Sequence, residues 1–424
     1  MVLVNSSEVF GGNLQGYQYD ENLYFDMGTH IFQESGFRSI DELLKSVVPS
    51  DDLIVFPPGR GDFTGGLYAT GLQTDTNFPI VETDDVYQGI ESWVSKLSSV
   101  PPIDRRRSAW DVAVSRFGEE FTATRLKPIL ESMFHMPIKE LSSFVLAMCG
   151  LSRVAASSMD RWESARDDDI WRAIMGVPNQ RLLPKELAHT RKSFYARNGG
   201  TRAFIDGLLT EAGFLGVNII SGVKDICIDI ENKVLSFHSL ENGESQIDFC
   251  MVFSALGVVG TAKLLNVDLQ SFDLQKGMPH TICNFKFSKP SMRSCFYYYG
   301  YESAASIYRV TDYDAFALNT ESTCRLTVEV LGDVDEEKIV PDILTELESV
   351  GLIEPDSCEF SAVERLPMGF PSPSTKNFRA MDKLAGQIEE SMPEFIKLGG
   401  AGFGGGRFFQ NEVVPHMYQM IESA

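Results

Sequence analysis

The stretch Phe25-Asp26-Met27-Gly28-Thr29-His30-Ile31-Phe32 decides the fold assignment of this 424-residue chain. Upstream, residues 2–4 predict a short strand and Gly11-Gly12 a tight turn. Paired glycines suit any tight turn as well as a backbone that approaches a ligand closely. On the residues alone, a core position for His30 is favoured over a ligand-facing one.

Composition excludes several classes of protein. The formal net charge of −22 argues against nucleic-acid and anionic membrane partners, because such binding faces need clustered Lys and Arg. A content of 43% hydrophobic and 23% charged residues is typical of a globular protein with a full core. The seven cysteines are widely spaced, with no C-x-x-C pair and no metal-ligand spacing, which indicates reduced thiols. No segment approaches the ~20 apolar residues of a membrane-spanning helix and no signal peptide is recognisable, so we expect a cytoplasmic protein.

Alternating helix and strand patterns predict a discontinuous, multidomain α/β fold. Three pieces, residues 1–83, 191–275 and 371–424, carry the α/β pattern. Residues 84–190 have helical periodicity and predict an inserted helical lobe. Residues 276–370 predict an antiparallel β domain, because the stretch that begins at His280 is rich in Tyr, Phe, Val and Thr.

Local patterns predict individual elements within these parts. In the lobe, Trp110, Val114 and Phe117 are expected to share one buried helix face. Helices are predicted at 39–48, 202–212, 336–350 and 410–423, a hairpin around 63–68, a ribbon of 223–230 with 233–239, and strands at 217–220 and 251–255.

Two further segments carry residues suited to binding. The glycine-rich run from Gly399 to Arg407 precedes a helix, where backbone N–H groups and the helix dipole suit an anion; a flexible linker is the alternative. In the predicted strand 308–313, alternation places Tyr308, Val310 and Asp312 on one face and Arg309 on the other. An arginine beside tyrosines suits a phosphate or carboxylate, although an arginine on a solvated sheet face is the commoner case.

These segments resemble FAD enzymes of the amine-oxidase, protoporphyrinogen-oxidase and UDP-galactopyranose mutase type. Gly28-Thr29-His30-Ile31-Phe32 resembles the G-x-H-I-F segment of the mutases, and residues 194–200 resemble the Y-P-x-G-G segment of the oxidases. Residues 223–226 are similar to a V-x-x-I strand that contacts adenine, and 254–256 to a stretch near the pyrophosphate. Residues 402–411 are similar to the segment that covers the flavin. These pieces occur in the family's order along nearly the whole chain.

The resemblance implies a Rossmann-like FAD-binding domain, made of the three α/β pieces, and a site for a small-molecule substrate. Its implied catalytic residues are His30, beside the flavin ring, and Arg309, as an anion anchor. The implied substrate-side residues are Arg309, Tyr308, Tyr299 and Tyr195. The implied cofactor contacts are Asn5, Gly11, Gly12, Gly28, Thr29, Val223, Ser254, Gly402, Gly406 and Arg407. No metal is implied.

The sequence departs from the family pattern in three places. Asn5 stands where a carboxylate normally binds the adenosine ribose. Asp312 replaces the glutamate of the mutase R-x-x-E-x-x-x-F segment, whose other members are Arg309 and Phe316, and Asp314-Ala315 replace its usual basic pair. No G-x-G-x-x-G unit precedes Val2, so we expect a complete gene product to carry about 30 further residues, the size of one strand, turn and helix.

The sequence therefore predicts an FAD-dependent oxidoreductase that transfers hydride to flavin N5, acting on a nucleotide-sugar or glycan precursor. One alternative is a mutase-like isomerase that uses reduced FAD to reopen and reclose a sugar ring. A second is a truncated, flavin-free homologue without catalysis. A third possibility is that a separate polypeptide supplies the missing strand and helix.

Overall fold

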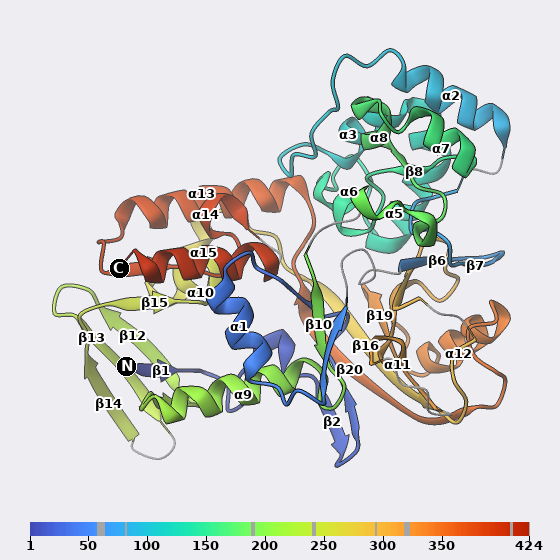
Figure 1. Cartoon of the computed structure of the whole chain (residues 1–424). Helices are drawn as coiled ribbons and strands as arrows, with labels where there is room; N and C mark the ends of the chain where they lie inside the picture. Colours follow the sequence, from blue (N-terminus) through green and yellow to red (C-terminus); the bar gives the residue numbers. More distant parts are fainter. Residues whose placement is uncertain are drawn as a thin grey trace. The chain divides into compact units, whose positions relative to one another are not determined.

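A computed structural model describes residues 1–56, 64–80, 83–187, 191–239, 243–292, 295–317, 323–407 and 410–423. The chain forms two compact units, and Figure 1 labels many of their helices and strands. Unit 1 comprises residues 1–56, 191–274 and 379–424, and unit 2 comprises 57–190 and 275–378.

Unit 1 contains two separate pairs of parallel strands. Strand β1 (Val2–Val4) pairs with β11 (Asn218–Ile220), and β15 (Val252–Ser254) pairs with β21 (Ile396–Leu398). Each strand is three residues long and carries Val, Ile or Leu, residues suited to strands, although β1 and β11 contain no buried residue. Helix α10 (Gly257–Leu264) follows β15 directly, as parallel strands require, since they are linked through helices.

The rest of unit 1 supports these pairs. Antiparallel strands form the sheet β4-β10-β5, the ribbon β12-β13-β14 and the hairpin β2-β3. Their bounds are β2 Tyr17–Asp20, β3 Leu23–Phe25, β4 Phe32–Gln33, β5 Leu53–Phe56, β10 Ser193–Ala196, β12 Lys224–Asp229, β13 Val234–Ser239 and β14 Gly243–Asp248. The helices are α1 Arg38–Ser46, α9 Gly200–Phe214, α14 Phe403–Gly406, α15 Gln410–Glu422 and most of α13, Thr375–Ser391. One core joins α9 to β4 and β10 through Phe204, Phe32 and Phe194.

Unit 2 is built on a seven-stranded mixed sheet in the order β20-β16-β19-β18-β17-β6-β7. The bounds are β6 Thr64–Tyr68, β7 Gly71–Gln73, β16 Met278–Phe287, β17 Tyr297–Gly300, β18 Ile307–Asp312, β19 Cys324–Leu331 and β20 Cys358–Phe370. All neighbouring pairs are antiparallel except β6 and β17, which run parallel. Helix α12 (Ile339–Ser349) covers one face, where Ile343 and Leu347 pack against Phe285 and Val328.

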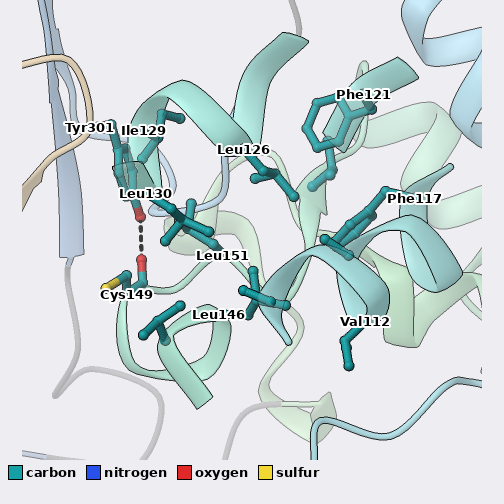
Figure 2. Close-up of a cluster of buried hydrophobic side chains, with 14 of the residues drawn as sticks. Val112, Phe117, Phe121, Leu126, Ile129, Leu130, Leu146, Cys149, Leu151 and Tyr301 are labelled. Carbon is teal, nitrogen blue, oxygen red and sulfur yellow. Dashed lines mark hydrogen bonds between the residues drawn. The ribbon is translucent and has the colours of Figure 1, made fainter. Parts of the chain in front are cut away.

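The helical lobe also belongs to unit 2. Its helices are α2 Asp84–Val94, α3 Ala109–Phe117, α4 Glu119–Phe121, α5 Lys127–Phe134, α6 Phe144–Met148, α7 Met159–Ala165 and α8 Asp169–Ile174, with a short parallel pair of β8 Val154–Ala155 and β9 Met175–Gly176. Figure 2 shows the lobe core around Leu126, Leu130 and Leu151. There the Tyr301 hydroxyl donates a 2.8 Å hydrogen bond to the Cys149 carbonyl, which ties the lobe to the sheet.

Most predicted elements are confirmed, and three details differ. The sheet predicted as antiparallel within residues 276–370 is mixed, because β6 and β7 join it and β6 runs parallel to β17. The ribbon β12-β13 continues into a third strand, β14, at its edge. The sequence does not predict this strand, because residues 243–248 are mostly polar, as edge strands often are. The buried face of α3 contains Val112, Ala113, Arg116 and Phe117, whereas Trp110 and Val114 are only half-buried. Arg116 is buried because its guanidinium donates hydrogen bonds to the carbonyls of residues 101, 152 and 173, which periodicity does not reveal.

Candidate functional site

A buried carboxylate, Asp26, organises the turn that contains residues 28–30. It is fully buried and accepts hydrogen bonds from the hydroxyls of Tyr24 at 2.7 Å and Tyr195 at 2.6 Å. Thr201 donates two more, from its backbone N–H at 2.9 Å and from its hydroxyl at 2.8 Å. Because Thr201 lies in the first turn of α9, the negative charge also complements the positive end of that helix. Asp26 therefore joins β3, β10 and α9 at one point.

Two glycines are required around this carboxylate. A Cβ at Gly200, whose φ is +52°, would lie 2.5 Å from the Asp26 Oδ1 atom, and a Cβ at Gly16 would collide with the Tyr24 hydroxyl. Burial, with a further contribution from the Asp26 charge, raises the pKa of Tyr24. Tyr24 therefore acts as a neutral hydrogen-bond donor. Tyr195, predicted on the substrate side, has its hydroxyl in this network and is 3% exposed.

His30 is held by its own turn. Its Nε2 atom lies 3.1 Å from the Met27 carbonyl oxygen, and the side chain is half-buried. Gly28 has a φ of +93°, a conformation that favours glycine, and Thr29 links Gly28 to His30. The backbone of this turn therefore fixes the orientation of the imidazole ring.

Asn5 and Val223, predicted as cofactor contacts, lie together at the end of β1. The Asn5 carbonyl accepts a 3.2 Å hydrogen bond from the Val223 N–H, and the Asn5 N–H donates to Ile220 at 2.9 Å. The side-chain amide of Asn5 donates to the carbonyls of Ser7 at 2.8 Å and Val9 at 3.1 Å. Its Oδ1 atom accepts no hydrogen bond from the described part of the chain and remains available as an acceptor.

The next turn contains Gly11 and Gly12. Gly11 has a φ of +110° and packs near Ile205 of α9, where a Cβ would lie 3.2 Å from a side-chain carbon. Gly12 has a φ of +53°, and no described atom lies within 4 Å of the position its Cβ would take. A side chain at Gly11 would therefore contact the protein, whereas a side chain at Gly12 would enter open space.

The glycine-rich run after β21 is an ordered turn from Gly399 to Arg407. The Gly399 N–H donates to the Ser254 carbonyl at 2.8 Å, and the Gly257 N–H returns a 3.2 Å bond to the Gly399 carbonyl. A Cβ at Gly400 would lie 2.6 Å from the Gly257 nitrogen, so close backbone packing requires that glycine. This run is therefore not a flexible linker. The Ser254 hydroxyl lies 2.8 Å from that of Thr261 and links the end of β15 to the middle of α10.

The end of this run folds back on itself. Gly402 (φ +94°) donates its N–H to the Arg407 carbonyl at 2.7 Å, and Gly406 has a φ of +85°. The Arg407 guanidinium donates to the Gly404 carbonyl, and the Gly404 N–H donates to Glu389 at 3.1 Å. At Gly405 (φ +80°) no described atom lies within 4 Å of a Cβ position. Among the glycines of this run whose surroundings are described, Gly405 is therefore the one with open space at its Cβ position.

In unit 2, Arg309 is paired with Glu329 on the neighbouring strand. Arg309 Nε and Nη2 donate to the two carboxylate oxygens at 2.6 Å and 3.0 Å, a bidentate arrangement. His280 Nε2 lies 3.2 Å from Glu329 Oε1. Burial raises the pKa of Glu329, but the charge of Arg309 and the adjacent His280 outweigh burial and bring it to about 2. Glu329 is therefore ionised at neutral pH and neutralises Arg309.

The predicted face of Tyr308 is wrong. Tyr308 and Val310 point to opposite sides of the sheet, since Val310 packs with the α12 core and Tyr308 with the lobe core. The reason is a register shift between Ile307 and Arg309 in the pairing of β18 with β19, which interrupts strict alternation. Tyr308 consequently lies beneath the Arg309 guanidinium, 5.4 Å from ring centre to the charged carbon. Tyr299, opposite Arg309 on β17, donates its hydroxyl to the Met148 carbonyl at 2.6 Å.

The residues that depart from the mutase pattern have structural partners. Asp312 caps the short helix α11 (Tyr313–Phe316) by accepting the Ala315 N–H at 2.9 Å, and it also accepts the Ser291 hydroxyl at 2.5 Å. Burial raises the pKa of Asp312 to about 6. Asp314 pairs with Arg325 at 3.0 Å. The side chain of Phe316 lies outside the described part of the structure.

The residues predicted as cofactor contacts all lie in unit 1, whereas Arg309, Tyr308 and Tyr299 lie in unit 2. Asp26 and Glu329 are organising carboxylates that sequence analysis missed. The burial of Asp26 could have been predicted, because it is an acidic residue within the apolar stretch of residues 25–32. The burial of Glu329 could not, because an acidic residue in a strand is usually exposed. Within the described residues, no group of three or more His, Cys, Asp or Glu side chains is placed to hold a metal, and no helix is long and apolar enough to cross a membrane.

The fold is a mixed α/β arrangement of several parts with a large mixed sheet, the class predicted from the sequence. Comparison with solved structures identifies the relatives by fold. A reduced UDP-galactopyranose mutase matches with a TM-score of 0.71 at 15% identity, over 100% of this chain and 87% of that chain. A protoporphyrinogen oxidase-like protein from Exiguobacterium sp. 255-15 has a TM-score of 0.65 at 15% identity, with 100% and 92% covered.

Cyclohexylamine oxidase from Brevibacterium oxydans also matches, with a TM-score of 0.57 at 10% identity and 100% and 93% covered. The fold resemblance predicted from short motifs is therefore confirmed. No protein-family model and no curated protein sequence matches the chain. At these identities the likeness establishes the fold alone.

Proposed function

We propose that the chain is an FAD-dependent oxidoreductase whose unit 1 binds the cofactor. The observation that carries the proposal is the junction of Asn5 with Val223 at the end of β1, together with two glycine turns that are each open at one residue. The fold neighbours include a mutase and two oxidase types. FAD, when bound, supplies a flavin N5 position that accepts a hydride from a substrate C–H bond.

The donors and acceptors of unit 1 fit parts of such a cofactor. The available Oδ1 of Asn5 suits a ribose hydroxyl as donor. Gly12 and Gly405 leave room that a side chain would fill, at positive φ, so a ligand can approach the backbone there. In this proposal His30 presents its ring edge to the flavin, with Nε2 oriented by the Met27 carbonyl.

The proposal is tested by titrating FAD into the purified chain and following the quenching of flavin fluorescence. Asn5→Leu removes the acceptor and is expected to weaken binding about tenfold, the value of one hydrogen bond of about 1.4 kcal/mol. Gly12→Ala and Gly405→Ala fill the open positions and are expected to weaken binding further. The matched control is Gly71→Ala, which has positive φ and open space but lies in the β6-β7 turn of unit 2. Equal affinities for all four variants would refute this site.

The sequence predicts a nucleotide-sugar or glycan precursor as the substrate and a mutase-like ring isomerase as the alternative function, and the fold match to a mutase is the observation that favours that alternative. Both depend on an anion anchor, and the guanidinium of Arg309 is already paired with Glu329. We therefore rank the oxidoreductase first. Conversion of a pyranose to a furanose nucleotide-sugar in the presence of reduced FAD, with no net oxidation, would reverse this order. Absence of any flavin binding would favour the flavin-free homologue.

A further inference from the structure

One face of the unit 2 sheet carries an unusual number of buried polar side chains. Directly opposite residues form two rows across β17, β18, β19 and β16, and the face they share is the one turned away from α12. The first row contains Thr311, Thr327 and Asn284, each fully buried. The second row contains Arg309 and Glu329. Burial of a polar side chain is costly unless the side chain finds a hydrogen-bond partner, so an apolar core alone does not favour a face of this composition.

The charges on this face cancel. Arg309 and Glu329 form a bidentate pair at 2.6 Å and 3.0 Å, and Glu329 is 2% exposed. Thr327 donates its hydroxyl to Asn284 at 2.5 Å, which adds no charge. The third donor nitrogen of Arg309, Nη1, donates to no acceptor in the described part of the structure, and the side chain keeps 18% exposure. Arg309 therefore keeps one donor nitrogen that a ligand could use, and its charge is already neutralised by Glu329.

From this arrangement we infer that Glu329 is a specificity-determining residue, which makes the Arg309 face accept an uncharged polar substrate group and reject phosphate or carboxylate. The inference rests on the proposed function in treating this face as the substrate side. An anion at Nη1 would have to approach the buried Glu329 carboxylate, which holds Arg309 by its other two donors. Like charges held close together in a buried site disfavour binding strongly, because little water is present to screen them. A hydroxyl or carbonyl oxygen accepts from Nη1 without that repulsion.

The test measures the binding of inorganic pyrophosphate to the flavin-free chain by calorimetry. Wild type and Arg309→Leu/Glu329→Leu are expected to bind pyrophosphate equally, because Arg309 contributes nothing to anion affinity when it is paired. Glu329→Gln unpairs the guanidinium at almost constant shape and is expected to bind at least tenfold more tightly. The gain should vanish in Arg309→Gln/Glu329→Gln. Glu346→Gln is the matched control, because Glu346 is a buried carboxylate bonded to Ser303 and Ala305 rather than to an arginine, and it should leave the affinity unchanged.

Two results would overturn the inference. One is wild-type binding of pyrophosphate that the double leucine variant loses, since that would make Arg309 an active anion anchor. The other is a folded Glu329→Gln variant with no gain. If Glu329→Gln does not fold, the comparison of wild type with the double leucine variant still decides, because replacing both members of a buried ion pair by apolar residues is usually tolerated. Since no flavin is present, failure of FAD binding leaves these results interpretable.

Discussion

Replacement of Asp26 by alanine should destabilise unit 1 selectively. The carboxylate is fully buried and accepts four hydrogen bonds, from Tyr24, Tyr195 and two donors of Thr201. The three donor residues are themselves at most 7% exposed, so water cannot replace the lost acceptor without opening the structure. Each donor left unpaired in such a site costs about 1–3 kcal/mol, so we expect the free energy of unfolding of unit 1 to fall by about 4 kcal/mol or more.

The chain offers its own internal control for this experiment. All four tryptophans, Trp93, Trp110, Trp162 and Trp171, lie in unit 2. Urea unfolding followed by tryptophan fluorescence therefore reports on unit 2, whereas far-ultraviolet circular dichroism reports on both units. Asp26→Ala should shift the dichroism transition to lower urea and leave the fluorescence transition in place.

A matched variant separates this effect from a general loss of charge. Asp20→Asn, in the β2-β3 hairpin that Asp26 follows, changes an exposed carboxylate whose side chain accepts, among the described residues, only from the Asn22 N–H. It should change stability by less than about 0.5 kcal/mol. A loss below about 1 kcal/mol for Asp26→Ala would refute the view that the carboxylate organises this turn.

Three further predictions concern local structure. In α9, Gly207→Ala should destabilise the chain by more than about 2 kcal/mol, because a Cβ there would collide with the Val47 carbonyl. Gly213→Ala should stabilise it by up to about 1 kcal/mol, because no described atom lies within 4 Å of its Cβ position. Thermal unfolding measures both effects, and equal effects would contradict the packing. The folded-state pKa of Asp312 is raised to about 6, above its unfolded value, so protonation of Asp312 favours the folded state. The resulting contribution to the free energy of unfolding amounts to about 3 kcal/mol at most. It is complete below pH ~4 and is lost as the pH rises through 6. Asp312→Asn should remove that dependence from urea-unfolding curves measured at a series of pH values, and an unchanged pH profile would show that the group is not protonated near pH 6. Two cysteines, Cys227 and Cys250, are exposed and should react rapidly with a thiol reagent in the native protein. The buried cysteines should react only on unfolding: Cys149, Cys283, Cys295 and Cys324. Rapid labelling of a buried thiol, located by mass spectrometry, would contradict its placement.

Sequence patterns were sufficient for the parts of the fold that depend on local periodicity. The short strand at residues 2–4, helix α9 and the parallel strand β15 were predicted because their apolar residues follow a helical period or form continuous runs. The same reasoning failed where a polar residue is buried by a specific partner. Arg116 is placed inside the lobe by three carbonyl acceptors from distant parts of the chain, and no local pattern encodes them.

The candidate site shows the same limit. The glycines of the turns were identified because positive φ is a local requirement. The partner of Arg309 was not, since Glu329 is 20 residues away and its proximity depends on the pairing of β18 with β19. A one-residue irregularity in that pairing also reversed the predicted face of Tyr308. Strand register is set by contacts across the sheet, which a single sequence does not display.

Binding of flavin by unit 1 can be measured from the visible absorption spectrum of the purified 424-residue chain after incubation with FAD and removal of free cofactor by gel filtration. We expect flavin absorption that elutes with the protein, and a weaker signal for Asn5→Leu and Gly405→Ala than for Gly71→Ala. A colourless protein fraction, under conditions in which circular dichroism shows the chain to be folded, would refute flavin binding by unit 1.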